Sequence, residues 1–179
     1  MTDGELLDLP STTFDAATMR WGLMFMPEPV ACLKRIHRAL KPGAAFATAT
    51  WAAPDKNPWA SVPLAVMKHY LDLPAPVPGQ TGIFAFADPQ RLKTSISAAG
   101  FRDVGIESFD VLWAGPASIR EYFGEVIEMA GPLASLYGKL SEDKKPAYAD
   151  EVAAQAERQS VRKPGVALSG VTWIAWGRK

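Results

Sequence analysis

Two short apolar runs, separated by one amphipathic stretch, limit the fold of this chain more than any other feature. The runs are Phe14–Met19 and Ala44–Trp51; each is too short for a buried helix and is bounded by turn-forming residues. Between them, apolar residues recur at helical spacing (Val30, Leu33, Ile36 and Leu40), and Lys41-Pro42-Gly43 ends the pattern. A buried strand, a crossover helix and a second buried strand form a parallel βαβ unit, so we expect the α/β class.

The remainder of the chain predicts further helices and at least two more strands. In order, we expect a helix from Asn57-Pro58 through Tyr70, a helix from Asp88-Pro89 to Gly100, a strand over 104–113, a helix from a capping box at Ser118 to Gly131-Pro132, a mostly exposed helix over 141–160 and a strand over 171–176. In the strand over 104–113, the apolar alternation slips near Glu107, from Val104 and Ile106 to Phe109 and Val111, which indicates a bulge. We expect these elements to form a single domain over residues 1–179.

The composition excludes several classes of function. The 19 basic residues are balanced by 19 acidic residues without long runs of one sign, so no nucleic-acid partner is expected. No apolar stretch reaches the roughly 18 residues of a membrane helix, and the first residues lack the pattern of a signal peptide, so we expect a cytoplasmic protein with no membrane segment. The single cysteine, Cys32, and the two separated histidines give no ligand spacing, so no metal is expected.

The glycine motifs of three common α/β enzyme classes are also missing. A Gly-x-Gly turn lets backbone N–H groups approach a phosphate or a cofactor, a Gly-x-Ser-x-Gly turn presents a nucleophilic serine, and a P-loop carries glycine at a fixed distance before Gly-Lys. The 179 residues contain none of these patterns. Dinucleotide-binding, serine-hydrolase and P-loop functions are therefore not expected.

A series of short segments carries a resemblance to a known family. The segments are 3–10 (DGELLDLP), 14–16 (FDA), 20–25 (RWGLMF), 38–43 (RALKPG) and 98–104 (AAGFRDV). In this order they resemble class I S-adenosylmethionine-dependent methyltransferases of the ubiquinone-biosynthesis-like type. The resemblance implies a Rossmann-like sheet, truncated so that only its C-terminal part remains: of the family's strand order 3-2-1-4-5-7-6, strands 4-5-7-6 are expected. Helical and loop insertions over 52–87 and 115–165 would face the substrate site.

The same resemblance implies which residues bind cofactor and substrate. Asp3 and Gly4 match the family positions that meet the adenine of S-adenosylmethionine. Arg20 and Trp21 follow the first strand, at the carboxyl edge where open α/β sheets bind ligands. The residues expected to face the substrate are Phe25, Trp51 and Trp59, for which plain core packing is the alternative. No catalytic residue is nominated, because a sulfonium is already a strong methyl donor and the reaction needs chiefly proximity and orientation.

Three readings of function remain open. The first is methyl transfer from S-adenosylmethionine to an unidentified small-molecule acceptor. The second is a non-catalytic remnant that serves as a dimerising or ligand-binding module, because the family's Gly-rich cofactor loop is absent from this sequence. The third is a piece of a longer enzyme of the same family. With strands 4-5-7-6 alone, the first strand would lie at the edge of the sheet. Since apolar edges seldom stay bare, we expect a homodimer through that edge, or a rearranged N-terminus that covers it.

Overall fold

The computed structural model describes residues 6, 8–75, 77, 79–114, 119–129, 131–161 and 167–179. Backbone contacts divide the chain into two compact units. The sheet unit comprises residues 1–53, 78–109 and 172–179, and the helical unit comprises residues 54–77 and 110–171. Strands β3 (Arg102–Ala114) and β4 (Ala167–Arg178) contribute residues to both units. That residues 1–179 form one domain stays a prediction, because compact units within one chain need not be separate domains.

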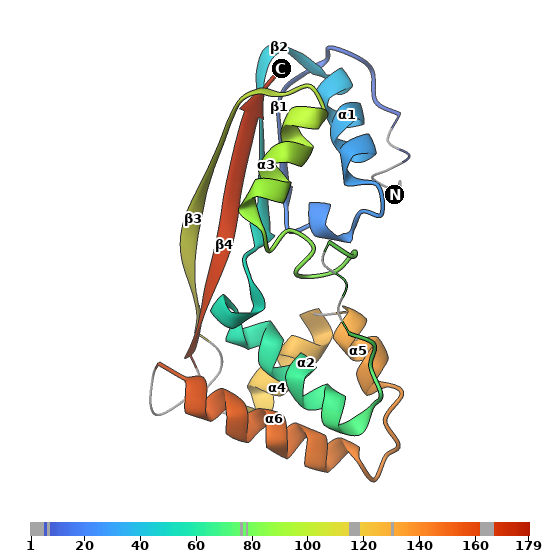
Figure 1. The fold of residues 1–179 in the computed structure, drawn as a ribbon, viewed down its shortest axis with the longest axis vertical. Helices are drawn as coiled ribbons and strands as arrows, with labels where there is room; N and C mark the ends of the chain where they lie inside the picture. The colour runs from blue at the N-terminus through green and yellow to red at the C-terminus, as the bar shows by residue number, and fades with distance from the viewer. Residues whose placement is uncertain are drawn as a thin grey trace. The chain divides into compact units, whose positions relative to one another are not determined.

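The sheet has four strands in the order β1-β2-β4-β3 (Figure 1). Strand β1 (Phe14–Arg20) runs parallel to β2 (Leu40–Trp51), and β2 runs antiparallel to β4. Helix α1 (Pro29–Ala39) connects the two parallel strands, as the sequence predicts. Numbered as in the methyltransferase family, the observed order is 4-5-7-6, so the expected fold is confirmed.

Strand β2 begins at Leu40, directly after α1 and before the turn that the sequence predicts at Lys41-Pro42-Gly43. Phe14 lies opposite Leu40, whereas Ala16 lies opposite Ala45, so the turn residues form an irregularity within the strand pair. Gly43 has a φ of +77°, a conformation in which other residues are strained. The residues expected to separate helix from strand are therefore part of the strand.

The two faces of the sheet differ in their cover. Helices α1 and α3 (Pro89–Ala98) lie side by side on one face (Figure 1), where the ring of Phe46 stacks on Phe101 with centroids 5.2 Å apart. The opposite face carries the alternate residues of each strand. Among the described residues it includes Ala16, Thr18, Ala45 and Trp176, all of them exposed.

Strand β1 is not the buried strand that its apolar run predicts. Five of its seven residues are exposed and the other two are half-buried. Within the described residues β1 has a strand neighbour on one side only, and its small alanine and threonine side chains leave a largely apolar groove of about 220 Å³ between its free edge and α1. An apolar run indicated a strand correctly, but it did not distinguish an edge strand from a central one.

The helical unit contains α2 (Pro58–Tyr70), α4 (Ile119–Met129), α5 (Gly131–Tyr137) and α6 (Lys145–Gln159). Most residues of helix α6 are exposed or half-buried, as expected, and the helix packs on α2 and α4 through its buried residues Tyr148, Val152 and Ala156, which recur at every fourth position. Helix α5 was not expected at all, because Gly131-Pro132 suggested a helix end, whereas here the proline lies in the first turn of a new helix. Ser118, on which the predicted capping box depends, lies outside the described residues.

The residues that begin and end helices predicted the helix bounds correctly, whereas apolar patterns did not always predict which side chains are buried. Helix α2 has the predicted bounds, and at α3 the Asp88 carboxylate accepts a hydrogen bond from the Gln90 backbone N–H at 2.9 Å, as an N-cap should. Gly100 follows α3 with a φ of +103° and ends it. In β3, however, Phe109 is 59% exposed, so the apolar alternation predicted there does not mark a buried face.

A titratable side chain in the sheet unit predicts how stability depends on pH. His37 of α1 is half-buried edge-on against Phe101, with ring centroids 4.9 Å apart. Loss of hydration, then Lys179 and more weakly Arg102, lower its pKa below the ordinary 6.5, although a backbone hydrogen bond at Gly100 acts in the opposite direction. The folded state therefore favours the neutral imidazole, so this stabilisation is complete above pH 6.5 and is lost as the pH falls below it.

We expect the free energy of unfolding to decrease between about pH 7.5 and about pH 5.5, and the His37→Gln variant to lose part of that decrease. Urea unfolding at a series of pH values measures it. The control is His69→Gln in the helical unit, which should leave the His37 contribution in place. An identical pH dependence in wild type and His37→Gln would contradict the assignment.

Candidate functional site

Trp21 stands directly after β1, at the carboxyl end of the parallel strand pair. Its φ of +51° is rare for a bulky residue. The Trp21 backbone N–H donates to the Ala49 carbonyl oxygen at 2.9 Å, and the indole Nε1–H donates to Thr172 Oγ1 at 3.2 Å. Backbone and side chain are thus both held by neighbouring strands, and this is the condition under which a strained conformation persists at functional sites.

The Trp21 indole is part of a stack with two other residues, which we call the tryptophan stack: Arg20, Trp21 and Trp51. The rings of Trp21 and Trp51 are nearly parallel, with an interplanar angle of 12° and centroids 4.6 Å apart. The guanidinium carbon of Arg20 lies over the Trp21 ring, 5.1 Å from its centroid. Trp51 is buried, Trp21 is half-buried and Arg20 is exposed, so the stack extends from the core to the surface.

Thr172 of β4 supports this stack, although sequence reasoning did not select it. Its hydroxyl accepts the hydrogen bond from Trp21 and donates to the Thr50 carbonyl oxygen at 2.7 Å. Thr172 also lies opposite Trp51 in the register of β2 and β4. Nothing in the local sequence distinguishes this threonine; its place follows only once the last strand is paired in register with β2.

The structure brings three of the seven predicted binding residues together. Arg20, Trp21 and Trp51 form the stack, while Phe25 lies in the short 3-10 helix η2 (Leu23–Phe25) with 39% of its surface exposed. Trp59 belongs to the helical unit, where it is buried and its indole N–H donates to Asn57 Oδ1 at 3.3 Å. Asp3 and Gly4 lie outside the described residues.

The chemistry of the stack is recognition of flat or cationic groups. Indole faces attract cations and stack on planar rings, and a guanidinium pairs with carboxylates. No group of histidine, cysteine, aspartate and glutamate side chains in the described part of the chain could hold a metal ion. None of the helices described is long and apolar enough to cross a membrane. The stack itself contains no acid or base that could exchange a proton near neutral pH.

Comparison with known proteins gives a consistent result. The profile of the family described as "Methyltransferase domain" matches residues 1–48. Demethylmenaquinone methyltransferase of Staphylococcus epidermidis is 29% identical over 126 residues, covering 61% of this chain and 50% of that protein. The enzyme of the same name from Lactiplantibacillus plantarum is 30% identical over 126 residues, covering 60% and 50%. The chain thus spans about half the length of these relatives.

Solved structures support the fold. A candidate methyltransferase from Bacillus halodurans superimposes with a TM-score of 0.57 at 16% identity, covering 99% of this chain and 75% of that one. The YcgJ protein of Bacillus subtilis gives a TM-score of 0.51 at 12% identity, covering 99% and 69%. At such identities these likenesses concern the fold alone. The matched profile, the sequence relatives and the strand order 4-5-7-6 thus agree: this chain is similar to class I S-adenosylmethionine-dependent methyltransferases and has their Rossmann-like fold.

Proposed function

We propose that this chain takes part in methyl transfer from S-adenosylmethionine to a small-molecule acceptor. The observation that carries the proposal is the tryptophan stack, which a strained backbone holds at the carboxyl end of β1. Open α/β sheets bind ligands at this edge. The named activity of the relatives, methylation of demethylmenaquinone, supports a small organic acceptor without identifying the one used here.

The residues of the stack fit part of such a cofactor. S-adenosylmethionine supplies a methyl group on a sulfonium, together with a flat adenine and a carboxylate. The exposed Arg20 guanidinium, which caps the stack, suits the carboxylate. The adenine or the sulfonium would contact the Trp21 indole once that guanidinium moves off the ring to meet the carboxylate. Asp3 and Gly4 remain proposed adenine contacts, and Phe25 and Trp59 remain proposed acceptor contacts.

Calorimetric titration with S-adenosylhomocysteine, the product form of the cofactor, tests the proposal without turnover. We expect binding at micromolar strength, about 8 kcal/mol. Trp21→Gly removes the indole at a position where glycine relieves the strained φ, and we expect it to weaken binding about tenfold or more, the usual contribution of one stacked base. Trp21→Phe should recover most of that loss.

The control for this titration is Phe109→Ala, which removes an exposed aromatic side chain elsewhere in the sheet unit. It should bind like wild type. No heat from wild type at millimolar ligand would exclude cofactor binding by this chain. Equal binding by wild type and Trp21→Gly would place the cofactor away from the stack.

A second candidate function, a dimerising module, rests on the free edge of β1. Phe14 is 40% exposed there and lines the apolar groove between β1 and α1. Unpaired edge backbone and accessible apolar side chains favour pairing with another strand. The proposed occupant is β1 of a second copy of this chain, because the two edges would present the same apolar residues to each other.

Sedimentation equilibrium of wild type, Phe14→Glu and Phe109→Glu tests the dimer. We expect wild type to be dimeric and Phe14→Glu to be monomeric, because a charge at the edge would have to be buried on pairing. Phe109→Glu makes the same chemical change at an exposed position of β3 and should leave the dimer intact. A monomeric wild type would overturn the proposal, and loss of the dimer in both variants would assign it to another surface.

A further inference from the structure

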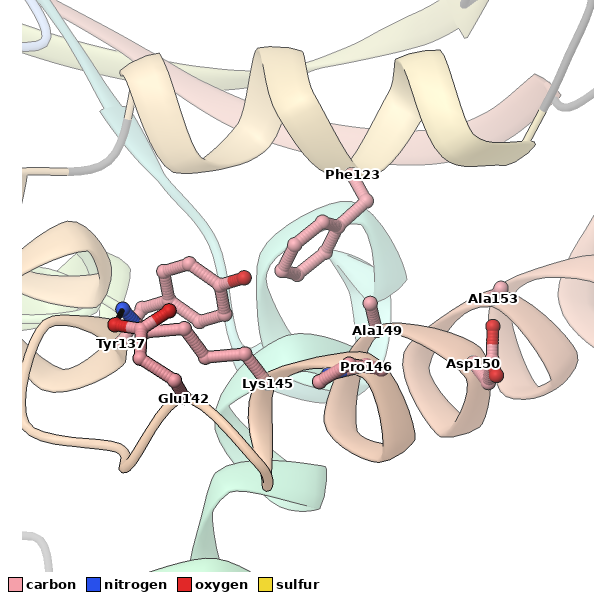
Figure 2. A pocket seen from close by; sticks show the side chains of 8 residues that line it. All are labelled: Phe123, Tyr137, Glu142, Lys145, Pro146, Ala149, Asp150 and Ala153. Atoms are coloured by element: carbon pink, nitrogen blue, oxygen red, sulfur yellow. Dashed lines mark hydrogen bonds and ion pairs between the residues drawn. The ribbon is translucent and has the colours of Figure 1, made fainter.

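The helical unit contains a pocket of about 470 Å³ that none of the predicted binding residues lines (Figure 2). Its size is within the usual range for small-molecule sites. Helices α4, α5 and α6 and the segment before α6 supply its principal lining residues: Phe123, Tyr137, Glu142, Lys145, Ala149 and Asp150. No residue of the tryptophan stack takes part, so any ligand bound here is additional to the proposed function.

Two aromatic rings form the walls of the pocket. Phe123 projects from α4 toward α6, and Tyr137 lies beside it (Figure 2), with centroids 5.3 Å apart and an angle of 72° between the rings. Both rings also contact Tyr148, at 5.6 and 5.8 Å, and the buried Tyr148 hydroxyl donates to the Pro63 carbonyl oxygen at 3.0 Å. The walls are therefore backed by an anchored aromatic residue.

Small side chains form the floor. Pro146, Ala149 and Ala153 of α6 line the pocket on the side opposite α4, with Pro146 and Ala149 below Phe123 in the view of Figure 2. A flat ring can stack on Phe123 in such a space, because planar groups make their best contacts between a ring and small side chains. Shape thus favours an aromatic ligand.

The charges in the pocket favour a cation. Glu142 and Asp150 are negative and Lys145 is positive, which gives a net charge of about −1 at pH 7. The Lys145 ammonium pairs with Glu142 and lies over the Tyr137 ring, 5.4 Å from its centroid. The pocket thus already places one ammonium against an aromatic face. An anionic ligand would have only Lys145 to meet, and that ammonium is engaged by Glu142.

From these walls, floor and charges we infer that the pocket binds an aromatic amine. The ring lies between Phe123 and the small residues of α6, and the ammonium is directed to the carboxylate of Asp150. Aromatic contact provides most of the affinity, and the carboxylates select for positive charge. The inference requires no cofactor and is independent of methyl transfer.

Three ligands that share one ring and differ in charge test the inference: phenethylamine, 2-phenylethanol and 3-phenylpropionate. Calorimetric titration of the full chain is done without S-adenosylhomocysteine, in a buffer of low ionic strength. We expect phenethylamine to bind about fivefold more tightly than the alcohol, and the carboxylate to bind most weakly. Equal affinities, or preference for the carboxylate, would overturn the assignment of an amine. No binding of any of the three would overturn the site.

Two matched variants locate the binding. Asp150→Asn should remove most of the preference for phenethylamine over 2-phenylethanol, whereas Glu157→Gln, the same charge change on an exposed residue of α6 outside the lining, should leave it unchanged. Phe123→Ala should weaken all three ligands alike, and circular dichroism confirms that it folds. If both charge variants lose the preference equally, the effect is general electrostatics and the pocket is not the site. Because the titration contains no cofactor, its failure leaves the methyl-transfer proposal standing.

Discussion

Replacement of Asn57 by leucine is expected to lower the free energy of unfolding by about 3 kcal/mol, the largest effect predicted for this chain. Asn57 is the only asparagine in the sequence and is fully buried. Its Oδ1 accepts from the Val171 backbone N–H at 3.0 Å, and its Nδ2–H donates to the Val171 carbonyl oxygen at 3.1 Å. The same Oδ1 accepts from the Trp59 indole. Leucine has a similar volume but leaves these buried groups without that partner.

Urea unfolding followed by circular dichroism measures this loss. Gln159→Leu is the matched control, because it also exchanges an amide for an isobutyl group, but at an exposed position of α6. Its effect should stay within about 0.5 kcal/mol. A loss below about 1 kcal/mol for Asn57→Leu would mean that water or relaxed backbone satisfies the groups around Val171.

The second large effect concerns Tyr122 and a proline inside a helix. Pro63 lies within α2 and has no N–H to donate to the Trp59 carbonyl four residues earlier. The buried Tyr122 hydroxyl donates to that carbonyl oxygen at 2.8 Å. A side chain from α4 thus supplies the hydrogen bond that the proline removes. We expect Tyr122→Phe to cost about 1.5 kcal/mol, the loss of a buried bond that leaves a carbonyl unsatisfied.

A double-mutant cycle isolates this compensation. In a Pro63→Ala background the helix can regain its own N–H donor to Trp59, so Tyr122→Phe should cost about 1 kcal/mol less than in wild type. Tyr148→Phe, which removes the hydroxyl bonded to the Pro63 carbonyl, should cost the same in both backgrounds. Urea unfolding of the six proteins supplies the values. Equal costs of Tyr122→Phe in both backgrounds would show that the two residues are not coupled.

The parts of the fold that the sequence predicts correctly depend on local chemistry. Asp88-Pro89 and Gly100 delimit α3 because the cap carboxylate, the proline and a positive φ act within a few residues. The resemblance to the methyltransferase family then supplied the strand order, which no local pattern in this chain encodes. Together they sufficed for the topology of the sheet.

The errors concern burial, which depends on neighbours that are distant in sequence. The run Phe14–Met19 is apolar, yet β1 is exposed, because among the strands that the structure describes it pairs with β2 alone. The apolar alternation over 104–113 suggested a buried face, yet Phe109 of β3 is 59% exposed. Composition alone cannot supply these partners.

In the candidate site, too, the features set by local sequence could be predicted, and those set by residues distant in sequence could not. That Arg20 and Trp21 occupy the carboxyl edge followed from their position after a strand. Their stack with Trp51 could not be predicted, because it depends on the positive φ of Trp21 and on the hydroxyl of Thr172. The pocket beside Phe123 was missed entirely, since its walls come from three separate helices.

The strand order also has a consequence for synthesis on the ribosome. β4 lies between β2 and β3 although it is the last of the four to be made, and the backbone of Lys179 is hydrogen-bonded to Gly43 and Ala44. Until Ala167–Arg178 has been synthesised, β2 and β3 therefore lack the strand that lies between them and hydrogen-bonds to both. The nascent chain can form β1, α1 and β2 early, but the sheet can close only after translation passes residue 178, so folding is governed by its most distant contacts.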